Sequence, residues 1–229
     1  MTLLAVLLFF GLLLGLVLQF AETAGRQRHP FSVHDLLAMD RISHAQGSPD
    51  GRRVAFAVRV TDLEANKGRN DIWLMNTDGS GLRRLTTHPA GSSHPRFSPD
   101  GRWIYFLSSR SQSMQVWRIS VDGGEAEQLT NLPLDVGCFA VSPDGRHLVV
   151  SMEVFRGTSP QQTRKRLDQQ GEAKASGRLY ERLFVRHWDT WKDGRRSHLF
   201  VLPIGGGEPV DIMKPVSYTH LTLPTIYSV

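Results

Sequence analysis

The sequence has little cysteine, because Cys138 is its one thiol residue. A single cysteine excludes an intrachain disulfide and any zinc site built from several cysteines. Cys138 stands in the apolar segment Val136–Val141, so we expect it to be buried and to have no chemical role. Disulfide-rich and cysteine-zinc scaffolds are therefore excluded.

The motifs of common enzyme classes are also missing. The sequence has no Gly-x-Ser-x-Gly, the turn that presents the nucleophile of an α/β-hydrolase. In Gly47–Gly51 the serine stands second and proline follows it, which indicates a plain turn. The glycine-rich segments Asp78–Gly81 and Gly205–Gly207 lack the helix and lysine of a P-loop and are interpreted as hairpin turns. The sequence predicts no catalytic residue, no cofactor-binding residue and no cofactor.

Positive charge is in excess but is not concentrated. The chain has 27 Lys and Arg against 22 Asp and Glu, a net charge of +5. Arg164–Arg166 forms a short basic run, and the other basic residues are scattered through turns and strands. Because no basic stripe with interleaved aromatics is present, nucleic acid is not predicted as a partner.

Few residues suggest a binding site. His187 with Asp189, and His88 with His94, could be metal ligands, but neither spacing is that of a recognised site and ordinary packing is favoured, so no metal is predicted. Glu153, at the apolar end of a strand, is the first carboxylate to consider for substrate contact. A surface ion pair is the favoured alternative for Glu153. The substrate-binding residues remain unassigned.

One long apolar run stands at the amino terminus. Leu3–Leu18 is sixteen apolar residues long, between the lengths of a signal-peptide core and a membrane span. Small residues follow in Ala21–Gly25, although no Lys or Arg precedes the run. We expect residues 1–25 to be a signal peptide, which places the protein in the periplasm or outside the cell. A membrane anchor formed by residues 3–18 is the alternative.

The carboxyl-terminal segment breaks the pattern of the rest of the chain. Val216–Thr225 matches, residue for residue, the translation of a transposase-end adapter used in sequencing. We therefore predict that residues 216–229 are an artefact and exclude them from fold reasoning.

A turn that leads into an apolar strand occurs three times. Each copy reads Ser-Pro-Asp-Gly-Arg, with the aspartates at Asp50, Asp100 and Asp144. Proline presets the second turn position, aspartate bonds nearby amides, and glycine accepts the positive φ of the reversal. The recurrence indicates an internal repeat of turn and strand.

The repeat keeps its register within each unit. Trp73 and Trp117 are forty-four residues apart, as are Thr86 and Thr130. Four strands in forty to fifty residues is the period of a β-propeller blade, and a β-sandwich would not keep this period. Blades bury both faces, which explains why Trp103–Leu107 is apolar almost throughout.

The predicted fold is therefore all-β: an incomplete β-propeller of three to four TolB-like blades of antiparallel strands over residues 47–215. Residues 26–46 form a leader with a short helix capped by Ser32. Residues 156–178 are a polar insertion, partly helical at most.

Several segments carry a resemblance to a known family. They are Pro30–Leu37, the Ser-Pro-Asp-Gly-Arg repeats, and above all Leu183–Trp191 with Asp193–Phe200. Over residues 30–212 the chain resembles the amino-terminal part of bacterial dipeptidyl aminopeptidases and acylaminoacyl peptidases of the prolyl oligopeptidase family. The repeats alone are shared with TolB-like propellers, whereas the His-Trp-Asp-Thr-Trp block is specific.

This resemblance implies a seven- or eight-bladed propeller above a carboxy-terminal α/β-hydrolase domain that carries Ser, Asp and His. The propeller would admit short peptides to that serine, so the expected partners are short peptides and the hydrolase domain of the same parent chain. This chain stops before that domain, and no catalytic residue can be carried over to it. The alternative is a non-enzymatic TolB-like periplasmic propeller that binds proteins.

Overall fold

A computed structural model describes residues 29–172, 177, 180 and 185–213. The predicted signal peptide at 1–25 and the predicted artefact at 216–229 lie outside these residues. Within the described part, no helix is long and apolar enough to cross a membrane. The chain divides into two compact units, Met1–Met39 and Asp40–Val229, which are described separately.

The first unit contains helix α2 (Val33–Ala38). Ser32 caps it as predicted: its hydroxyl accepts a hydrogen bond from the Asp35 amide, and the Asp35 carboxylate accepts one from the Ser32 amide at 2.7 Å. Together these bonds form a capping box. None of the helical residues is buried, so the cap, and not packing, determines where this helix begins.

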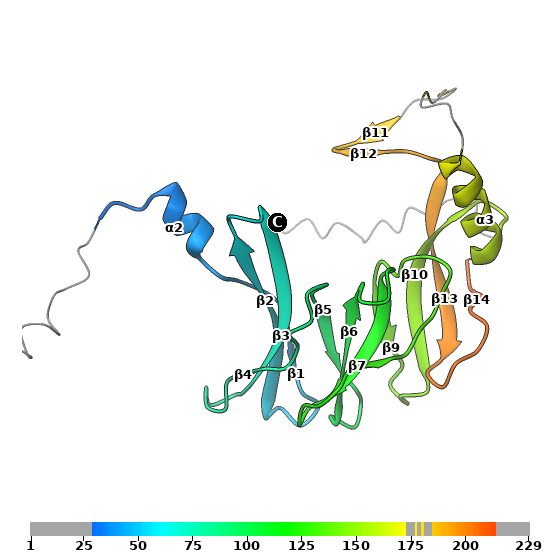
Figure 1. Ribbon diagram of the computed structural model, residues 1–229. Coiled ribbons are helices and arrows are strands. Elements are labelled where there is room, and N and C mark those ends of the chain that lie inside the picture. The colour runs from blue at the N-terminus through cyan, green and yellow to red at the C-terminus, as the bar shows by residue number, and fades with distance from the viewer. Residues whose placement is uncertain (1–28, 173–176, 178–179, 181–184, 214–229) are drawn as a thin grey trace, which may run out of the picture. The chain divides into compact units, whose positions relative to one another are not determined.

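The second unit consists mainly of three antiparallel four-stranded sheets, shown in Figure 1. The first sheet has the order β1-β2-β3-β4, the second β5-β6-β7-β8 and the third β14-β13-β10-β9. The bounds are β1 Arg41–Gly47, β2 Arg53–Asp62, β3 Lys67–Asn76, β4 Arg83–Arg84, β5 Ser93–Phe97, β6 Trp103–Ser108, β7 Gln115–Ser120, β8 Glu127–Gln128, β9 Phe139–Val141, β10 His147–Phe155, β13 Arg195–Pro203 and β14 Val210–Asp211. The all-β architecture with propeller-type sheets is confirmed.

The sheets begin one strand earlier than the sequence repeat indicated. The strand before each Ser-Pro-Asp-Gly turn pairs with the strand after it, as β5 does with β6. The first sheet therefore begins at Arg41 and not at residue 47. The reason is the turn itself, because a tight reversal pairs the strands on its two sides.

Two apolar clusters join the sheets. One contains Ala55, Ile72 and Leu74 of the first sheet with Ile104 and Phe106 of the second. The other joins Tyr105, Leu107 and Val116 of the second sheet to residues of the third, among them Leu148, Val150 and Phe200. Successive residues of β6 thus face opposite neighbours, which explains its continuous apolar sequence.

The three Ser-Pro-Asp-Gly turns have the same geometry. In the second, Ser98 Oγ lies 2.5 Å from Asp100 Oδ1, which also accepts from the Arg102 amide at 3.1 Å. The glycines take φ values of +70°, +69° and +68° at Gly51, Gly101 and Gly145. A Cβ atom on Gly101 would lie 3.7 Å from Pro49 Cδ, and one on Gly145 would lie 3.6 Å from Pro99. The second and third turns therefore each come within van der Waals range of the proline in the preceding turn.

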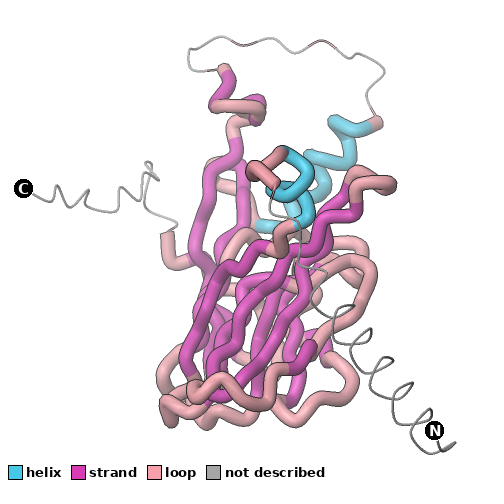
Figure 2. Tube along the Cα trace, turned by 90° about the vertical axis from the view of Figure 1, so that its left-hand side faces the viewer, coloured by secondary structure: helices cyan, strands magenta, loops and turns pink. Residues whose placement is uncertain are grey.

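The insertion after β10 is more ordered than predicted. Helix α3 (Pro160–Gly171) occupies twelve residues of it, whereas the sequence indicated a loop with little helix. Ser159 caps the helix through a capping box with Gln162, and Pro160 stands in its first turn. A hairpin of β11 (Arg186–His187) and β12 (Thr190–Trp191) follows. In Figure 1, α3 lies at one end of β10 and β13, and Figure 2 shows the strands of the sheets side by side.

Candidate functional site

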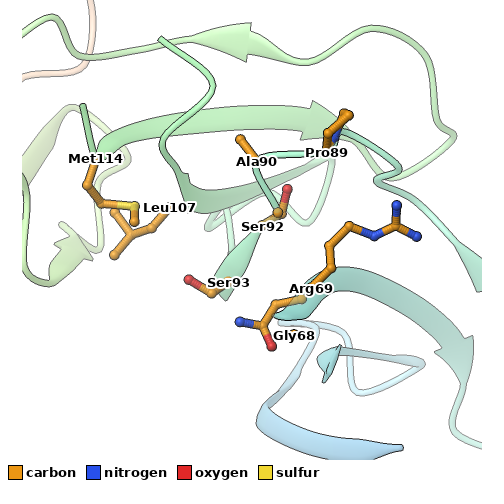
Figure 3. A pocket seen from close by; sticks show the side chains of 10 residues that line it. Gly68, Arg69, Pro89, Ala90, Ser92, Ser93, Leu107 and Met114 are labelled. Atoms are coloured by element: carbon orange, nitrogen blue, oxygen red, sulfur yellow. The ribbon is translucent and has the colours of Figure 1, made fainter. Parts of the chain in front are cut away.

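A pocket of about 110 Å³ lies between the first and second sheets. Figure 3 shows Leu107 and Met114 on one side of it and Arg69 on the other. It is lined by Gly68, Arg69, Asn70, Pro89, Ala90, Gly91, Ser92, Ser93, Leu107 and Met114. Gly91 is needed at its rim, because its φ is +74° and a Cβ atom would lie 3.2 Å from the Asn70 carbonyl oxygen. The pocket thus combines an apolar floor with hydroxyl, amide and guanidinium groups.

A buried carboxylate holds the charged wall of the pocket in place. Asp71 is 2% exposed, and its Oδ2 accepts from Arg69 Nε at 3.1 Å and Arg84 Nη2 at 2.7 Å. Thr86 Oγ1 lies 3.4 Å from the other carboxylate oxygen and accepts from the Ile72 amide at 2.9 Å. A buried charge with these partners is compensated, and Arg69 is held at the pocket edge.

The other two sheets bury a polar residue at the same place. In the second sheet Gln115 Oε1 accepts from Thr130 Oγ1 at 2.7 Å, and Thr130 Oγ1 accepts from the Val116 amide at 2.9 Å. In the third, His198 Nδ1 lies 2.9 Å from Asp211 Oδ2. Asp71, Gln115 and His198 thus all fasten the short fourth strand of their sheet to its third strand.

A second guanidinium lies near the pocket, on Arg110. It stacks on the rings of Phe106 and Trp117, with centroid distances of 5.1 Å and 5.0 Å. Its nitrogens donate to Ser108 Oγ and Ser92 Oγ, both at 3.1 Å. Burial lowers the pKa of Arg110, although Asp71 and Glu125 oppose the shift. Ser92 therefore connects Arg110 to the pocket wall.

The insertion after β10 carries a separate polar cluster at its base. Glu153 forms an ion pair of 3.4 Å with Arg195 Nη2, and Arg195 Nε donates to Asp193 Oδ2 at 2.6 Å. Burial raises the pKa of Asp193, but hydrogen bonds from the Arg195 backbone and side chain outweigh it and leave that pKa below its usual value. Glu153, the carboxylate selected from the sequence, is thus in an ion pair.

The β11–β12 hairpin exposes aromatic side chains. Trp188 is 86% and Trp191 53% exposed, and Trp188 has a φ of +52°. Tyr180 stacks on Trp191 with a centroid distance of 6.0 Å, and Arg186 lies over the same ring at 5.5 Å. The specific sequence block therefore forms a projecting aromatic tip.

The structure corrects the expectation for Cys138, which is exposed and not buried. Cys138 precedes β9, the first strand of the third sheet, where its amide donates to Ser151 Oγ at 2.9 Å. The apolar run misled because Cys138 lies just before β9 and outside the strand, so that its side chain is exposed although its neighbour Phe139 is buried.

Of the two metal pairings that the sequence analysis considered and did not favour, His88 and His94 make separate contacts. His88 Nδ1 accepts from the Ala90 amide at 3.2 Å. His94 instead stacks on His44, with ring centroids 3.8 Å apart. The side chain of His187, proposed to pair with Asp189, lies outside the described part of the chain. In that part, no group of three or more His, Cys, Asp and Glu residues could hold a metal ion.

The contact between His44 and His94 was missed from the sequence. Each histidine stands six residues before the aspartate of a turn, Asp50 or Asp100, a signal that the repeat contained. Burial lowers the pKa of His94, and the charges of His44 and Arg96 lower it further.

Comparison with known proteins identifies the family to which these sheets belong. Residues 66–185, which are 120 of the 229 residues, match the family described as the Tricorn protease N-terminal beta propeller domain. The chain belongs to this family of propeller domains. The match begins at the end of the β2–β3 turn of the first sheet and ends in the insertion of the third sheet.

Relatives of this propeller include peptidases. Dipeptidyl-peptidase 5 of Porphyromonas gingivalis is 36% identical over 155 residues, 68% of this chain and 22% of that protein. The Tol-Pal system protein TolB of Syntrophotalea carbinolica is 39% identical over 57 residues, 25% of this chain and 13% of that protein. The resemblance to the propeller part of prolyl oligopeptidase family members is confirmed. The chain spans about a fifth of the length of its dipeptidyl-peptidase relative.

A solved structure shares the fold of this propeller. The acylaminoacyl peptidase of Pyrococcus horikoshii superposes with a TM-score of 0.57 at 18% identity, over 76% of this chain and 25% of that one. At this identity the likeness concerns the fold.

Proposed function

We propose that this chain is the propeller part of an exported serine peptidase of the dipeptidyl or acylaminoacyl type. In that protein it admits short peptides to a carboxy-terminal α/β-hydrolase domain. The observation that supports this most is the 36% identity to Dipeptidyl-peptidase 5 over 155 residues, 68% of this chain.

The arrangement of the sheets suits a selective passage. The β2–β3 and β6–β7 connections and the insertion after β10 all leave their sheets at one end. The pocket, the Glu153–Arg195 pair and the aromatic hairpin therefore lie toward that end. Sheets packed through two apolar clusters cannot move apart readily. In the parent protein we expect this end to admit flexible peptides and to exclude folded proteins.

Bond cleavage itself belongs to the hydrolase domain of the parent protein. There a serine would attack the peptide carbonyl and form an acyl-enzyme, with histidine as the base and aspartate orienting it. The described residues bind and orient peptides and take no part in that covalent step.

The test is a length series of peptides with the full-length protein. We expect release from short peptides, no cleavage of folded proteins, and loss of activity with a serine-reactive phosphonate. A full-length protein that contains Gly-x-Ser-x-Gly, yet cleaves folded proteins as fast as short peptides, would contradict the gating role.

Export is part of the same proposal and has a separate test. We expect the mature protein in the periplasmic or extracellular fraction, with residues 1–25 removed. An amino-terminal sequence that still includes Leu3–Leu18 in the membrane fraction would instead favour the anchor.

The short match to TolB supports a second candidate, a periplasmic propeller without an enzyme that binds proteins of the envelope. The complete coding sequence separates the two. A stop soon after the last blade, with no nucleophile motif, would favour the binding module.

A further inference from the structure

The pocket between the first and second sheets contains a guanidinium group with donors to spare. Arg69 donates through Nε to the buried Asp71, and among the described residues its two Nη groups have no partner. The Arg69 side chain is 43% exposed and lines the pocket opposite Leu107 and Met114 (Figure 3). We propose that this pocket binds the carboxylate of a short peptide, an inference that rests on the proposed function for the class of ligand.

The bond through Nε fixes the guanidinium in an orientation that suits a carboxylate. Arg69 Nε and Arg84 Nη2 donate to the same oxygen of Asp71, at 3.1 Å and 2.7 Å. A guanidinium is planar and its donors form a rigid fork, so a bond at Nε leaves the Nη edge to bind a second acid group. The single charge of Asp71 balances one of its two arginines, and this wall of the pocket keeps a net positive charge.

A buried hydroxyl supplies a further donor. Ser92 is 2% exposed and lines the pocket. Its Oγ accepts from Arg110 Nη2 at 3.1 Å, and its own proton has no acceptor among the described residues. A hydroxyl that accepts from a charged group becomes a stronger donor itself. We therefore expect the Ser92 hydroxyl to donate to one carboxylate oxygen while Arg69 donates to the other.

The loop that carries Ser92 is held in place before any ligand binds. The Ser92 amide donates to the Asn70 carbonyl oxygen at 2.7 Å, which fixes the loop to β3. Ser108 Oγ donates to the Gly91 carbonyl oxygen at 2.6 Å, which fixes it to β6. Groups that are already ordered lose less entropy when a ligand binds, so this arrangement favours binding.

The charges around the pocket favour an anion. A Cβ atom on Gly68, which lines the pocket, would overlap the Arg59 guanidinium, so Arg59 adds a second positive charge on the Arg69 side. On the opposite side the Asp135 carboxylate accepts from the Met114 amide at 2.8 Å and is engaged with the backbone. Positive charge therefore gathers on the side of the pocket that carries the free donors.

The size and the apolar side of the pocket restrict the ligand further. A volume of about 110 Å³ suits a group the size of one amino-acid side chain. Leu107 and Met114 offer an apolar surface, which suits the carbon atoms next to a carboxylate but contributes nothing to an inorganic anion. The carboxy terminus of a peptide and an acidic side chain share this chemistry, and the experiment distinguishes them.

The experiment measures binding of matched short peptides to the full chain by calorimetry. One pair differs in a free or amidated carboxy terminus, and a second, amidated pair differs in Glu or Gln at the last residue. We expect the carboxylate member of a pair to bind about tenfold more tightly than its neutral partner. A preference within the first pair assigns the carboxy terminus, and one within the second pair assigns the acidic side chain. Equal affinities within both pairs would overturn the proposal.

Arginine variants test whether this pocket is responsible. The preference for a carboxylate should disappear in Arg69→Gln and weaken in Arg59→Gln, where the native side chain is exposed. Arg84→Gln is the matched control, because it removes the other partner of Asp71 without changing a residue that lines the pocket. It should keep the preference. Equal loss in Arg69→Gln and Arg84→Gln would show a structural effect and overturn the proposal.

A second measurement guards against poor folding of the variants. The carboxylate peptide should raise the melting temperature of the parent chain and of Arg84→Gln more than its neutral partner does. For Arg69→Gln the two peptides should have the same effect. A difference that persists in Arg69→Gln would contradict the assignment of this pocket.

The binding assay is independent of the proposed function because it uses this chain alone and requires no cleavage. If the full-length protein cleaves short peptides but shows no preference for a carboxylate, only this inference fails. If the chain shows the preference and the full-length protein cleaves no peptide, the proposed function fails and the binding site stands.

Discussion

At the scale of single residues, the polar side chains that bond the fourth strands to the third strands are expected to contribute strongly to stability. Asp71, Gln115 and His198 are buried, and each has a specific partner on or beside the fourth strand. When a buried polar group loses its partner, the fold is destabilised by more than the hydrogen bond itself contributed. Substitutions at these residues should therefore lower the free energy of unfolding more than substitutions of similar residues on the surface.

Replacing Thr86 with valine tests this. The change keeps the shape of the side chain but leaves the Ile72 amide without its acceptor at 2.9 Å, so we expect the free energy of unfolding to fall by about 1–3 kcal/mol. Urea unfolding measures it. Thr87→Val, at the exposed neighbouring threonine, should change stability little. Equal effects of the two substitutions would show that the buried bond is unimportant.

The turn aspartates should make stability depend on pH. The Ser98 hydroxyl, followed by the Arg102 amide, lowers the pKa of Asp100 below its usual value. A carboxyl whose pKa is lower in the folded state stabilises the fold above the pKa of the unfolded chain, and this stability is lost as pH falls through the folded value. We therefore expect the free energy of unfolding to decline with acid below about pH 4.

Asp100→Asn should make that decline shallower, because one titrating group is removed while an oxygen acceptor remains. Unfolding curves at a series of pH values measure the slope. Glu64→Gln, at an exposed carboxylate outside the turns, serves as the control. An unchanged acid slope in Asp100→Asn would contradict the assignment.

At the scale of elements, the strands were predictable and helix α3 was not. Strands such as β6 follow from a repeated turn and a continuous apolar run, which are both local signals. Helix α3 has no apolar period, and of its residues only Pro160 and Thr163 are buried. Its signals are at its start, in Ser159, Pro160 and Gln162, where capping and not burial specifies the helix.

Ser159→Ala should therefore loosen α3. The alanine cannot accept from the Gln162 amide, now bonded at 3.2 Å, and loss of such a cap costs about 0.5–2 kcal/mol. Hydrogen exchange of residues 160–171 should become faster, while that of β10 stays near its original rate. Gln161→Ala, in the same turn, should have little effect. Equal exchange in the two variants would mean that packing alone holds the helix.

At the scale of the whole molecule, the contacts between sheets could not be read from the sequence. The repeat predicts that neighbouring sheets pack, but not that His94 contacts His44 or that Arg69 lies beside Ser92 at one pocket. Such contacts depend on the angle between sheets and on local bulges. Sequence reasoning accordingly recovered the architecture but not the contact between His44 and His94.

The packing of the sheets predicts which of them a core substitution destabilises. Phe106 is 0% exposed and belongs to the cluster between the first and second sheets, so Phe106→Ala should cost about 3–5 kcal/mol. Because each sheet contacts only its neighbours, hydrogen exchange should rise in the first and second sheets before the third. Phe31→Ala, at a side chain that is 69% exposed, is the control. A uniform rise over all three sheets would contradict this.

The contact between successive turns bears on how such a chain could have arisen. Gly101 lies against Pro49, and Gly145 against Pro99, so the four-residue turn supplies both halves of its own joint. A duplicated gene segment that carries this turn would arrive with a matching surface for the copy before it and the copy after it. Adding a blade would then require no new complementary mutations where its turn meets the neighbouring turn, which favours growth of the propeller by tandem duplication.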